Sequence, residues 1–308
     1  MRIVFMGTPD YSVKTLEALI DAGHDVVGVF AQPDKPVGRK QILTPPPVKQ
    51  LALEKNIPVF QPNTLRDGTA LQTIKELEPE VIVVVAYGKI LPREILDYPK
   101  YGCVNGHASL LPKLRGSAPI QWAIINGDKI TGVTTMLMND GVDTGDILEM
   151  YETEIGEEET AEELFERLAV ISADGMVKTL DKLQKGELTP IKQDDSQATH
   201  APMIKKEMAH IDFNKTSKEI CNAVRGYYSW PCAFFFLDSK RIKVISAKES
   251  VSTNCEPGTV IKSDDNLVIA AGNGTSVEFL VIQPEGSKQM TASQMLCGKK
   301  IAVGTVAQ

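Results

Sequence analysis

The feature that most constrains the fold is an uninterrupted apolar run, Val81–Val85. A strand with one face in water alternates apolar and polar residues, whereas a short run without polar residues predicts a strand buried on both faces. Strands of that kind occupy the middle of parallel sheets that helices cover on both sides. The run therefore predicts an α/β architecture with this strand near the centre of the sheet.

The segments around this run alternate between strand and helix patterns. We expect strands at residues 2–6, 26–31, 57–60 and 81–86, and helices at residues 10–22, 47–56 and 67–78. For the first helix, we expect Thr8 to cap the start, Pro9 to take the first helical position and Gly23 to mark the end. Repeated strand–helix–strand units predict a parallel sheet with helices on both faces.

The opening strand, Gly7 and the helix that follows also suggest a dinucleotide-binding turn. Such a turn needs glycines at the spacing Gly-x-Gly-x-x-Gly, so that the backbone can approach a pyrophosphate closely. Gly7 is not followed by glycine at either of the other two positions. We therefore reject NAD or FAD as the ligand. We still expect a binding site at this edge of the sheet, because ligands of open parallel sheets lie beyond the carboxyl ends of the strands.

A polar, irregular stretch divides the chain. Before it, residues 155–185 begin with a run of glutamates and continue as an amphipathic helix. After it, a helix near 215–225 precedes several short β-type segments separated by Gly, Asn and Asp, a pattern typical of a small barrel. We predict an α/β chain with an N-terminal Rossmann-like, parallel-sheet domain at residues 1–188, a linker at 189–206 and an OB-like small β-barrel domain at 207–308.

Aromatic residues gather where the barrel is expected to begin. They are Tyr227, Tyr228, Trp230 and Phe234–Phe236. Rings in such a cluster could stack on nucleic-acid bases, but near the start of a barrel they more often fill the core. We interpret them as core residues.

The net charge of −7 argues against a general nucleic-acid binder, yet the charge is unevenly distributed. Residues 1–203 carry 20 Lys and Arg against 30 Asp and Glu, which gives −10, whereas residues 204–308 carry 13 against 10, which gives +3. An acidic first part joined to a mildly basic second part fits a protein that touches RNA through one end. Ordinary drift in composition between two domains explains the same asymmetry equally well.

Cysteine and histidine usage excludes several classes of site. The five cysteines form no CxxC pair and no disulfide framework, so we expect reduced thiols in a cytoplasmic protein. The four histidines have no His or Cys partner at metal-ligand spacing, and we predict no metal. The N-terminus has no signal-peptide pattern, and the longest apolar run is far too short to cross a membrane.

The chemistry of the chain is concentrated between residues 103 and 146. Asn105 and His107 stand two residues apart in an expected strand, so their side chains should project from the same face. Asp143 follows in a Gly-flanked turn. An amide, an imidazole and a carboxylate suit acyl transfer between nitrogens, because the reaction needs oxyanion donors and a group that moves protons.

Each of these residues also has a simpler explanation. Asn105-Gly106 is a common hairpin-turn dipeptide, but no alternating strand follows it within a few residues. A single His beside a strand end is more often structural than catalytic. Asp143 and Asp146 could be turn residues that bond their own backbone. The argument for a site depends on their combination with the apolar, proline-containing segment Ser109–Gly116.

This combination closely resembles the methionyl-tRNA formyltransferase family, which uses 10-formyltetrahydrofolate. The segments that carry the resemblance are Phe5–Tyr11, Gln32–Arg39, Val85–Pro92, Asn105-x-His107-x-Ser109-Leu-Leu-Pro112, Ala118–Gln121 and Asp143–Asp146. It covers nearly the whole chain and is weakest after about residue 204. The Asn-x-His pair with Asp is shared by all enzymes of this formyl-folate chemistry, whereas the first two segments are typical of the tRNA enzymes.

The resemblance implies an enzyme that formylates the amino group of methionyl-initiator tRNA through a tetrahedral intermediate, in bacterial-type translation initiation. It implies Asn105, His107 and Asp143 as catalytic residues. The folate co-substrate would be lined by Ser109, Leu110, Leu111, Pro112, Tyr87 and Gly88, which are expected on the same rim of the sheet. Arg39 and Lys40 would contact the tRNA acceptor end. They lie in the proline-rich segment 32–47, which we expect to be an exposed connection rather than a strand.

One residue departs from the family pattern, and two other functions remain to be weighed. The family usually carries a β-branched residue where this chain has Gly106, so the backbone between the two candidate catalytic residues is less restricted. The alternative to a tRNA formyltransferase is a formyltransferase that acts on a small amine, such as a ribonucleotide or an amino sugar nucleotide. A non-catalytic RNA-binding protein is opposed by the intact Asn105, His107 and Asp143. We expect a monomer without membrane contact.

Overall fold

The computed structural model describes residues 1–38, 40–298 and 301–308. The chain divides into two compact units, which are described separately. The N-terminal unit comprises residues 1–117, 130–154 and 165–201. The C-terminal unit comprises residues 118–129, 155–164 and 202–308. The two short pieces 118–129 and 155–164 thus belong to the C-terminal unit, although N-terminal-unit residues flank both in the sequence.

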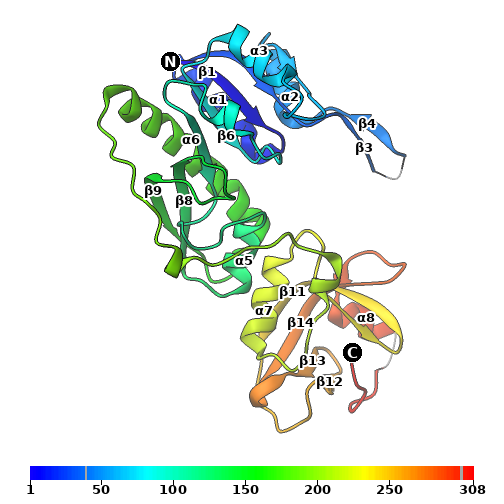
Figure 1. The fold of residues 1–308 in the computed structure, drawn as a ribbon. Coiled ribbons are helices and arrows are strands. Elements are labelled where there is room, and N and C mark those ends of the chain that lie inside the picture. Colours follow the sequence, from blue (N-terminus) through cyan, green and yellow to red (C-terminus); the bar gives the residue numbers. More distant parts are fainter. Residues whose placement is uncertain (39, 299–300) are drawn as a thin grey trace. The chain divides into compact units, whose positions relative to one another are not determined.

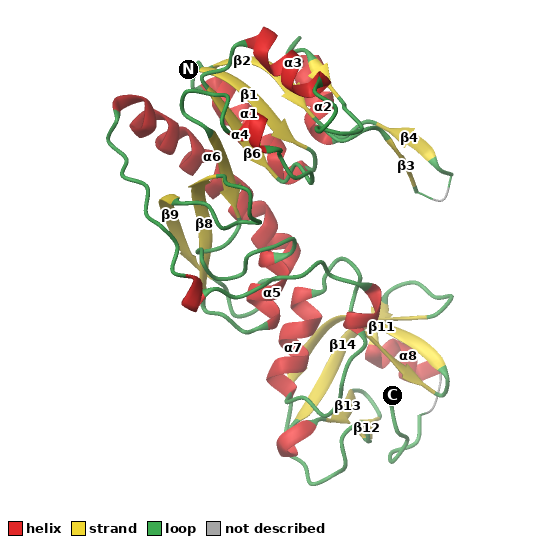
Figure 2. Ribbon diagram, viewed as in Figure 1, coloured by secondary structure: helices red, strands yellow, loops and turns green. Residues whose placement is uncertain are grey.

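The N-terminal unit is built on a seven-stranded sheet (Figure 2) with the order β5-β2-β1-β6-β7-β8-β9. The strands are β1 Arg2–Gly7, β2 Asp25–Phe30, β5 Val59–Phe60, β6 Val81–Val85, β7 Cys103–His107, β8 Ile130–Leu137 and β9 Ile147–Glu154. The first five in the sheet order run parallel, while β7–β8 and β8–β9 pair antiparallel. All five residues of β6 are buried in the middle of the sheet. The prediction made from its apolar run is confirmed.

Helices cover both faces of this sheet. They are α1 Asp10–Asp21, α2 Pro47–Glu54, α3 Thr69–Leu77, α4 Arg93–Leu96 and α6 Ala161–Lys185, with a short 3-10 turn at Asp195–Gln197. One face of the sheet packs into a core that α3 and α4 share, through side chains such as Met6, Ile82 and Ile74. The expected cap of the first helix is wrong: Pro9 is the cap residue, and the Thr8 hydroxyl instead donates to the Tyr87 carbonyl.

The proline-rich segment after β2 contains a hairpin, so the expectation of a connection without strands is wrong. β3 Lys35–Val37 pairs antiparallel with β4 Ile42–Thr44. Pro36 is tolerated because this two-stranded sheet is exposed and all its strands are edge strands. Figure 1 shows the hairpin projecting from the rest of the N-terminal unit. Arg39 lies outside the described residues, and Lys40 is exposed beside the turn.

The C-terminal unit contains an antiparallel sheet with the order β10-β11-β14-β13-β12. Its strands are β10 Phe234–Leu237, β11 Lys240–Glu249, β12 Val260–Ser263, β13 Leu267–Ala270, β14 Ser276–Pro284 and β15 Met290–Thr291, which pairs with β14. Its helices are α5 Pro119–Ile125, α7 Ser217–Gly226 and α8 Ala292–Gly298, with 3-10 turns at Lys206–Ala209 and Gly272–Gly274. Bulges in β11 near Ser246 bend the sheet.

The last residues of the chain close this sheet into a barrel. On one side, Gly304 and Ala307 bond to the backbone at Val260 and Gly258, next to the edge strand β12. On the other side, Gln308 exchanges two backbone hydrogen bonds with Phe236 of the opposite edge strand β10, at N–O distances of 2.6 and 2.9 Å. The OB-like barrel predicted from the sequence is confirmed, and its closing segment is one that the strand pattern did not reveal.

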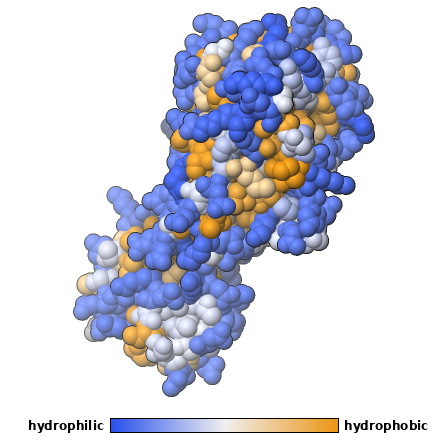
Figure 3. Space-filling model, turned by 90° about the vertical axis from the view of Figure 1, so that its left-hand side faces the viewer, coloured by the Kyte–Doolittle hydropathy of each residue, from blue (hydrophilic) through white to orange (hydrophobic). Residues whose placement is uncertain are grey.

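The aromatic residues at the start of the barrel serve mainly the core, as interpreted from the sequence. Tyr227, Phe234 and Phe235 are buried. Trp230 and Phe236 are the exceptions, with 55% and 36% of their surfaces exposed. On the face drawn in Figure 3, hydrophilic residues cover most of the surface and apolar residues gather in smaller areas.

Two further expectations concern cysteines and membranes. All five cysteines are unpaired, as expected: Cys103, Cys221, Cys232, Cys255 and Cys297. Within the described part of the chain, no helix is both long enough and apolar enough to cross a bilayer.

Candidate active site

The centre of the candidate site is the carboxyl end of β7. This strand pairs with β6 on one side and with β8 on the other, and it ends at His107. Asn105 and His107 project from one face of the strand, and the intervening Gly106 faces α6, where Ser172 and Met176 lie. Both candidate side chains are nearly buried, with 9% and 7% exposure.

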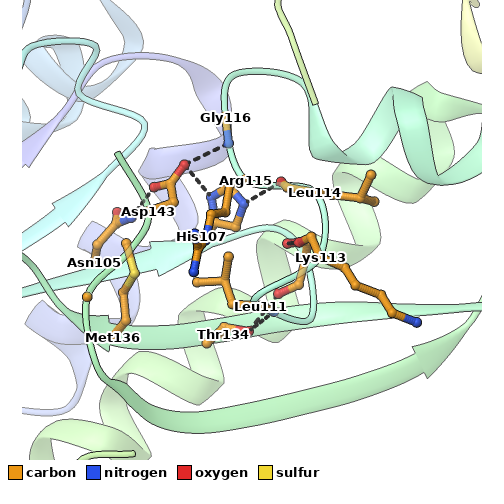
Figure 4. A network of polar contacts seen from close by, with 12 residues as sticks. Asn105, His107, Leu111, Lys113, Leu114, Arg115, Gly116, Thr134, Met136 and Asp143 are labelled. Carbon is orange, nitrogen blue, oxygen red and sulfur yellow. Dashed lines mark hydrogen bonds and ion pairs between the residues drawn. The ribbon is translucent and has the colours of Figure 1, made fainter. Parts of the chain in front are cut away.

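Asp143 brings a carboxylate to both of these side chains (Figure 4). Its Oδ1 lies 3.5 Å from Asn105 Nδ2, and its Oδ2 lies 3.6 Å from His107 Nδ1. The backbone N–H of Gly116 donates to the same Oδ2 at 2.8 Å. The structure thus brings together the three residues that the sequence singled out, although 38 positions separate Asn105 from Asp143.

The imidazole of His107 is held at both ring nitrogens. Nδ1 faces the carboxylate of Asp143, and Nε2 lies 2.9 Å from the backbone carbonyl oxygen of Leu114. The Leu114 carbonyl can only accept, so Nε2 donates to it, while Nδ1 lies 3.6 Å from the carboxylate. These two contacts fix the orientation of the ring beside the Asn105 amide.

Two residues next to the imidazole have left-handed backbone conformations. Leu114 has φ of 58° and Asp143 has φ of 54°. Non-glycine residues rarely adopt this conformation and occupy it only where their surroundings hold them, often at functional sites. The Leu114 carbonyl and the Gly116 N–H were not singled out from the sequence. The Arg115-Gly116 pair in the recognised motif was the one available signal.

The loop after β7 is fixed by short-range hydrogen bonds. Ser109 Oγ donates to the Lys113 carbonyl at 2.6 Å. Thr134 Oγ1 on β8 donates to the Ser109 carbonyl at 2.7 Å and accepts the Leu111 N–H at 3.0 Å. Leu111 is buried, whereas Leu110 and Pro112 are partly exposed. Of this apolar wall, Leu110 and Pro112 are therefore the side chains that a ligand can reach.

Tyr87 and Gly88 lie just beyond the end of β6. The Tyr87 ring belongs to the core on the α3 and α4 side, with 2% exposure, and burial raises the pKa of its phenol to about 12. The Tyr87 carbonyl accepts hydrogen bonds from Thr8 Oγ1 and from Gln32 Nε2, both at 3.1 Å. Gly88 has φ of 79°, which favours glycine. The backbone here makes a sharp, fixed turn at the rim of the sheet.

A cavity of about 490 Å³ opens in the segment that follows this turn. It is lined by Leu65, Arg66, Gly68, Leu71, residues 90–95 and Asp140. The lining is mostly aliphatic, and its charged members balance: Arg66 and Arg93 against Glu94 and Asp140. Of the loop around the candidate catalytic residues, only Asp140, three residues before Asp143, contributes to it. Such a cavity suits a ligand with an apolar surface.

Two further features of the chain bear on the expected ligands. Over residues 1–38, 40–298 and 301–308, the structure contains no group of three or more His, Cys, Asp or Glu placed to hold a metal ion. On the hairpin, Lys40 is exposed, and apolar side chains are exposed beside it at Val37, Ile42 and Leu43. The hairpin thus presents a mixed cationic and apolar surface.

Comparison with known proteins gives matches over both units. The family model for formyl transferase matches residues 1–180, and that for the formyl transferase C-terminal domain matches residues 203–300. A methionyl-tRNA formyltransferase of Caldanaerobacter subterraneus subsp. tengcongensis is 49% identical over 308 residues, covering 99% of both chains. That of Thermodesulfovibrio yellowstonii is 47% identical over 302 residues, covering 98% of this chain and 97% of the relative.

Solved structures share the fold at lower identity. An N-formyltransferase from Helicobacter canadensis, in complex with folinic acid and dTDP-3-aminofucose, is 20% identical with a TM-score of 0.69, covering 91% of this chain and 98% of that one. A methionyl-tRNA formyltransferase from Clostridium thermocellum is 23% identical with a TM-score of 0.54, covering 88% and 100%. At this identity the likeness concerns the fold alone.

Proposed function

The chain belongs to the formyl transferase family and is a formyltransferase, and we propose that it transfers the formyl group of 10-formyltetrahydrofolate to the amino group of methionyl-initiator tRNA. The observation that carries this proposal is the convergence of Asn105, His107 and Asp143 at the end of β7. The proposed substrate is that of the methionyl-tRNA formyltransferases to which the chain is 47–49% identical over both units. Bacterial-type translation initiation is the process that uses such a product.

The proposed reaction exchanges one carbon–nitrogen bond for another. The amine of the methionyl group attacks the formyl carbon, a tetrahedral intermediate forms, and the bond from that carbon to N10 of the folate breaks. The attacking nitrogen loses one proton and N10 gains one. Catalysis therefore needs donors for the oxyanion and a group that manages these protons.

The three polar residues have distinct roles in this proposal. Asn105 Nδ2 has two hydrogens, and only one of them faces Asp143, so the other can donate to the oxyanion. The imidazolium of His107 adds a second, cationic donor when it exchanges its contact with Leu114 for one with substrate. Asp143 orients that ring and keeps it charged, or accepts the proton of the attacking amine.

For the folate co-substrate, we propose a site on the rim between β6 and β7. The residues expected there were Ser109–Pro112, Tyr87 and Gly88. The partly exposed Leu110 and Pro112 offer an apolar wall, and Gly88 gives close backbone approach. The cavity beyond Gly88 is large enough to hold part of a folate, and the aliphatic side chains of its lining offer apolar contact.

For the tRNA, we propose that the hairpin residues Arg39 and Lys40 contact the acceptor end and that residues 207–308 contact the tRNA backbone more weakly. Phosphate contacts of lysine and arginine weaken as salt rises, so transfer to tRNA should depend steeply on ionic strength. In this division of labour, residues 1–188 form the catalytic domain and 189–206 the linker. We further propose that the protein acts as a monomer in the cytoplasm.

The substrate is tested by one transfer assay with three acceptors in parallel. Charged initiator tRNA, charged elongator tRNA and small amines such as an amino sugar nucleotide are offered with the same formyl-folate. We expect rapid transfer to the initiator tRNA only. Preferred transfer to a small amine would establish the alternative function. This outcome is tested because an N-formyltransferase solved with dTDP-3-aminofucose shares the fold.

The catalytic roles are tested by replacing Asn105, His107 and Asp143 with Ala one at a time. Removing one oxyanion donor costs roughly 10²–10³ in rate in other enzymes, and we expect losses of that order with folate affinity changed only a few-fold. Glu152→Ala is the control, because it removes an exposed carboxylate of β9 in the same unit. Near-normal turnover of His107→Ala or Asp143→Ala would refute the assignment.

A further inference from the structure

Arg115 belongs to the motif that identified the chain, yet the proposed chemistry gives it no role. Its side chain is buried, with 7% exposure. The guanidinium donates to Gln193 Oε1 twice, from Nε at 3.0 Å and from Nη2 at 2.7 Å. Nη2 also reaches the exposed Asp195 at 2.8 Å. These two charge-assisted hydrogen bonds hold the amide oxygen of Gln193 in one position.

Gln193 connects Arg115 to the loop of the candidate carboxylate. Its Nε2 donates to the Asp143 carbonyl at 2.9 Å and to the Gly145 carbonyl at 2.7 Å. The orientation of the amide follows from chemistry, because a guanidinium only donates and carbonyls only accept. The residue is 6% exposed. Both hydrogens of the amide are thus used to hold the turn on which Asp143 sits.

The chain around Gln193 binds the loops on both sides of the site. Residues 191–201 will be called the strap. Ile191 exchanges two backbone hydrogen bonds of 2.8 Å with Ile147, just after the Asp143 turn. Further along the strap, the Leu114 N–H donates to Thr199 Oγ1 at 2.8 Å. The strap and the residues that it binds here all belong to the N-terminal unit.

The two loops bound by the strap contain the two left-handed residues of the site. Leu114 and Asp143 occupy a backbone region that non-glycine residues adopt infrequently, leucine even less often than aspartate, and neighbouring groups bond to both. The strap supplies these bonds at Leu114 through Thr199 and at Asp143 through Gln193. The strap thus bonds to the backbone of both residues that face the nitrogens of His107, at the Leu114 N–H and at the Asp143 carbonyl.

We propose that Gln193 is a positioning residue for Asp143, and that Arg115 acts by locking the Gln193 amide in the orientation that donates to the Asp143 turn. The inference rests on the proposed function of Asp143. Without the two donated hydrogen bonds, the turn relaxes from its left-handed conformation and the carboxylate leaves Asn105 and His107. Displacements of about 1 Å in a catalytic group can cost roughly 100-fold in rate.

The first test compares Gln193→Glu with Gln193→Met. The carboxylate introduced by Gln193→Glu keeps the bonds from Arg115 but cannot donate to the two carbonyls, whereas Gln193→Met keeps the length and removes both ends. If Gln193 acts by donating to the turn, both variants lose kcat by roughly 10- to 100-fold, with KM for folate and tRNA within about twofold. Gln197→Glu makes the same chemical change at an exposed site of the strap and should leave kcat unchanged.

The second test asks whether Gln193 acts through Asp143. In an Asp143→Ala background, under single-turnover conditions, Gln193→Glu should cause no further loss, since the group that it positions is gone. All rates are normalised to the folded fraction measured by thermal melting. Should Gln193→Glu fail to fold, the same cycle is run with Gln193→Met.

The outcomes separate this proposal from the one on which it rests. If Asp143→Ala itself keeps normal turnover, the proposed function fails. If Asp143→Ala is impaired but Gln193→Glu keeps its kcat, the positioning role is wrong. Losses that multiply in the double variant, or that appear in KM rather than in kcat, also overturn it, because they assign Gln193 a general structural role.

Discussion

Gly106 lies between the two candidate catalytic side chains of β7, and its surroundings determine the effect of restoring the β-branched residue that the family usually carries. A Cβ at this position would lie 3.0 Å from Ser172 Oγ, 3.4 Å from Met176 Cε and 3.6 Å from Val85 Cγ2. Ser172 and Met176 are fully buried on α6. The single Cβ of alanine is therefore already tight, and the two further methyl groups of valine enter space that α6 occupies.

The net effect follows from two opposed terms. Replacing a glycine restricts the unfolded chain and stabilises the fold by about 0.4–1 kcal/mol where the backbone permits it. Overpacking a filled core costs about 1–3 kcal/mol. We expect Gly106→Val to destabilise the N-terminal unit by about 1–2 kcal/mol, which lowers Tm by roughly 2–4 °C per kcal/mol in a unit of this size. Gly106→Ala should lie near the native value.

The assay is a double-mutant cycle with Ser172→Ala, which removes the atom nearest to the new side chain. Calorimetry should show that Gly106→Val loses less Tm in the Ser172→Ala background than alone, because the contact at 3.0 Å is gone. Turnover should recover with Tm, since displacing β7 displaces Asn105 and His107. An equal or higher Tm for Gly106→Val alone would refute this reasoning, because it would show that α6 shifts to accommodate the valine without loss of stability.

Three further predictions concern charge, thiol reactivity and barrel closure. The hydrogen bond from Lys49, at 2.8 Å, holds the pKa of the Asp34 carboxyl below its usual value, so Lys49→Met should raise that pKa. Ionised Asp34 stabilises the base of the hairpin at neutral pH, and this stabilisation is lost as pH falls through the pKa of the folded state. NMR titration of the carboxyl group tests the direction of the shift. Burial raises the pKa of Cys103 to about 12, so iodoacetamide at pH 8 should modify exposed Cys255 while sparing Cys103 in the native protein, and rapid labelling of Cys103 would contradict its burial. Deleting residues 304–308 should lower the Tm of the C-terminal unit by several degrees, because the barrel loses its closing backbone hydrogen bonds; an unchanged Tm would mean that this closure adds no stability.

The sequence predicted those parts of the molecule that local patterns determine. The run Val81–Val85 placed β6 in the sheet centre because burial on both faces removes the alternation. The spacing of Asn105 and His107 placed them on one face because side chains alternate along a strand. These inferences need only the residues of one element. They also located the rim of the sheet, where the turn after β6 and the end of β7 are found.

The errors came from residues whose structure depends on distant partners. Thr8 is a favourable cap residue by composition, but the carbonyl of Tyr87, 79 positions away, takes its hydroxyl. The hairpin 35–44 was missed because Pro36 suggests a break, whereas an exposed edge strand tolerates proline. The closure of the barrel was missed because residues 304–308 join two edge strands by backbone bonds alone, which leave no side-chain pattern.

The same distinction separates the groups proposed to do the chemistry from those that hold them. Asn105 and His107 could be found from two positions of one strand, but the contacts that support them join positions far apart: 50 residues separate Gln193 from Asp143, and 78 separate Arg115 from Gln193. Aspartate is one of the few non-glycine residues that adopt the left-handed backbone seen at Asp143, but the local sequence does not show which distant groups bond to the turn. In the structure, Gln193 of the strap donates to two of its carbonyls. Substitution of Gln193, the buried strap residue that donates to this turn, should therefore affect turnover more than its distance from the reacting atoms suggests.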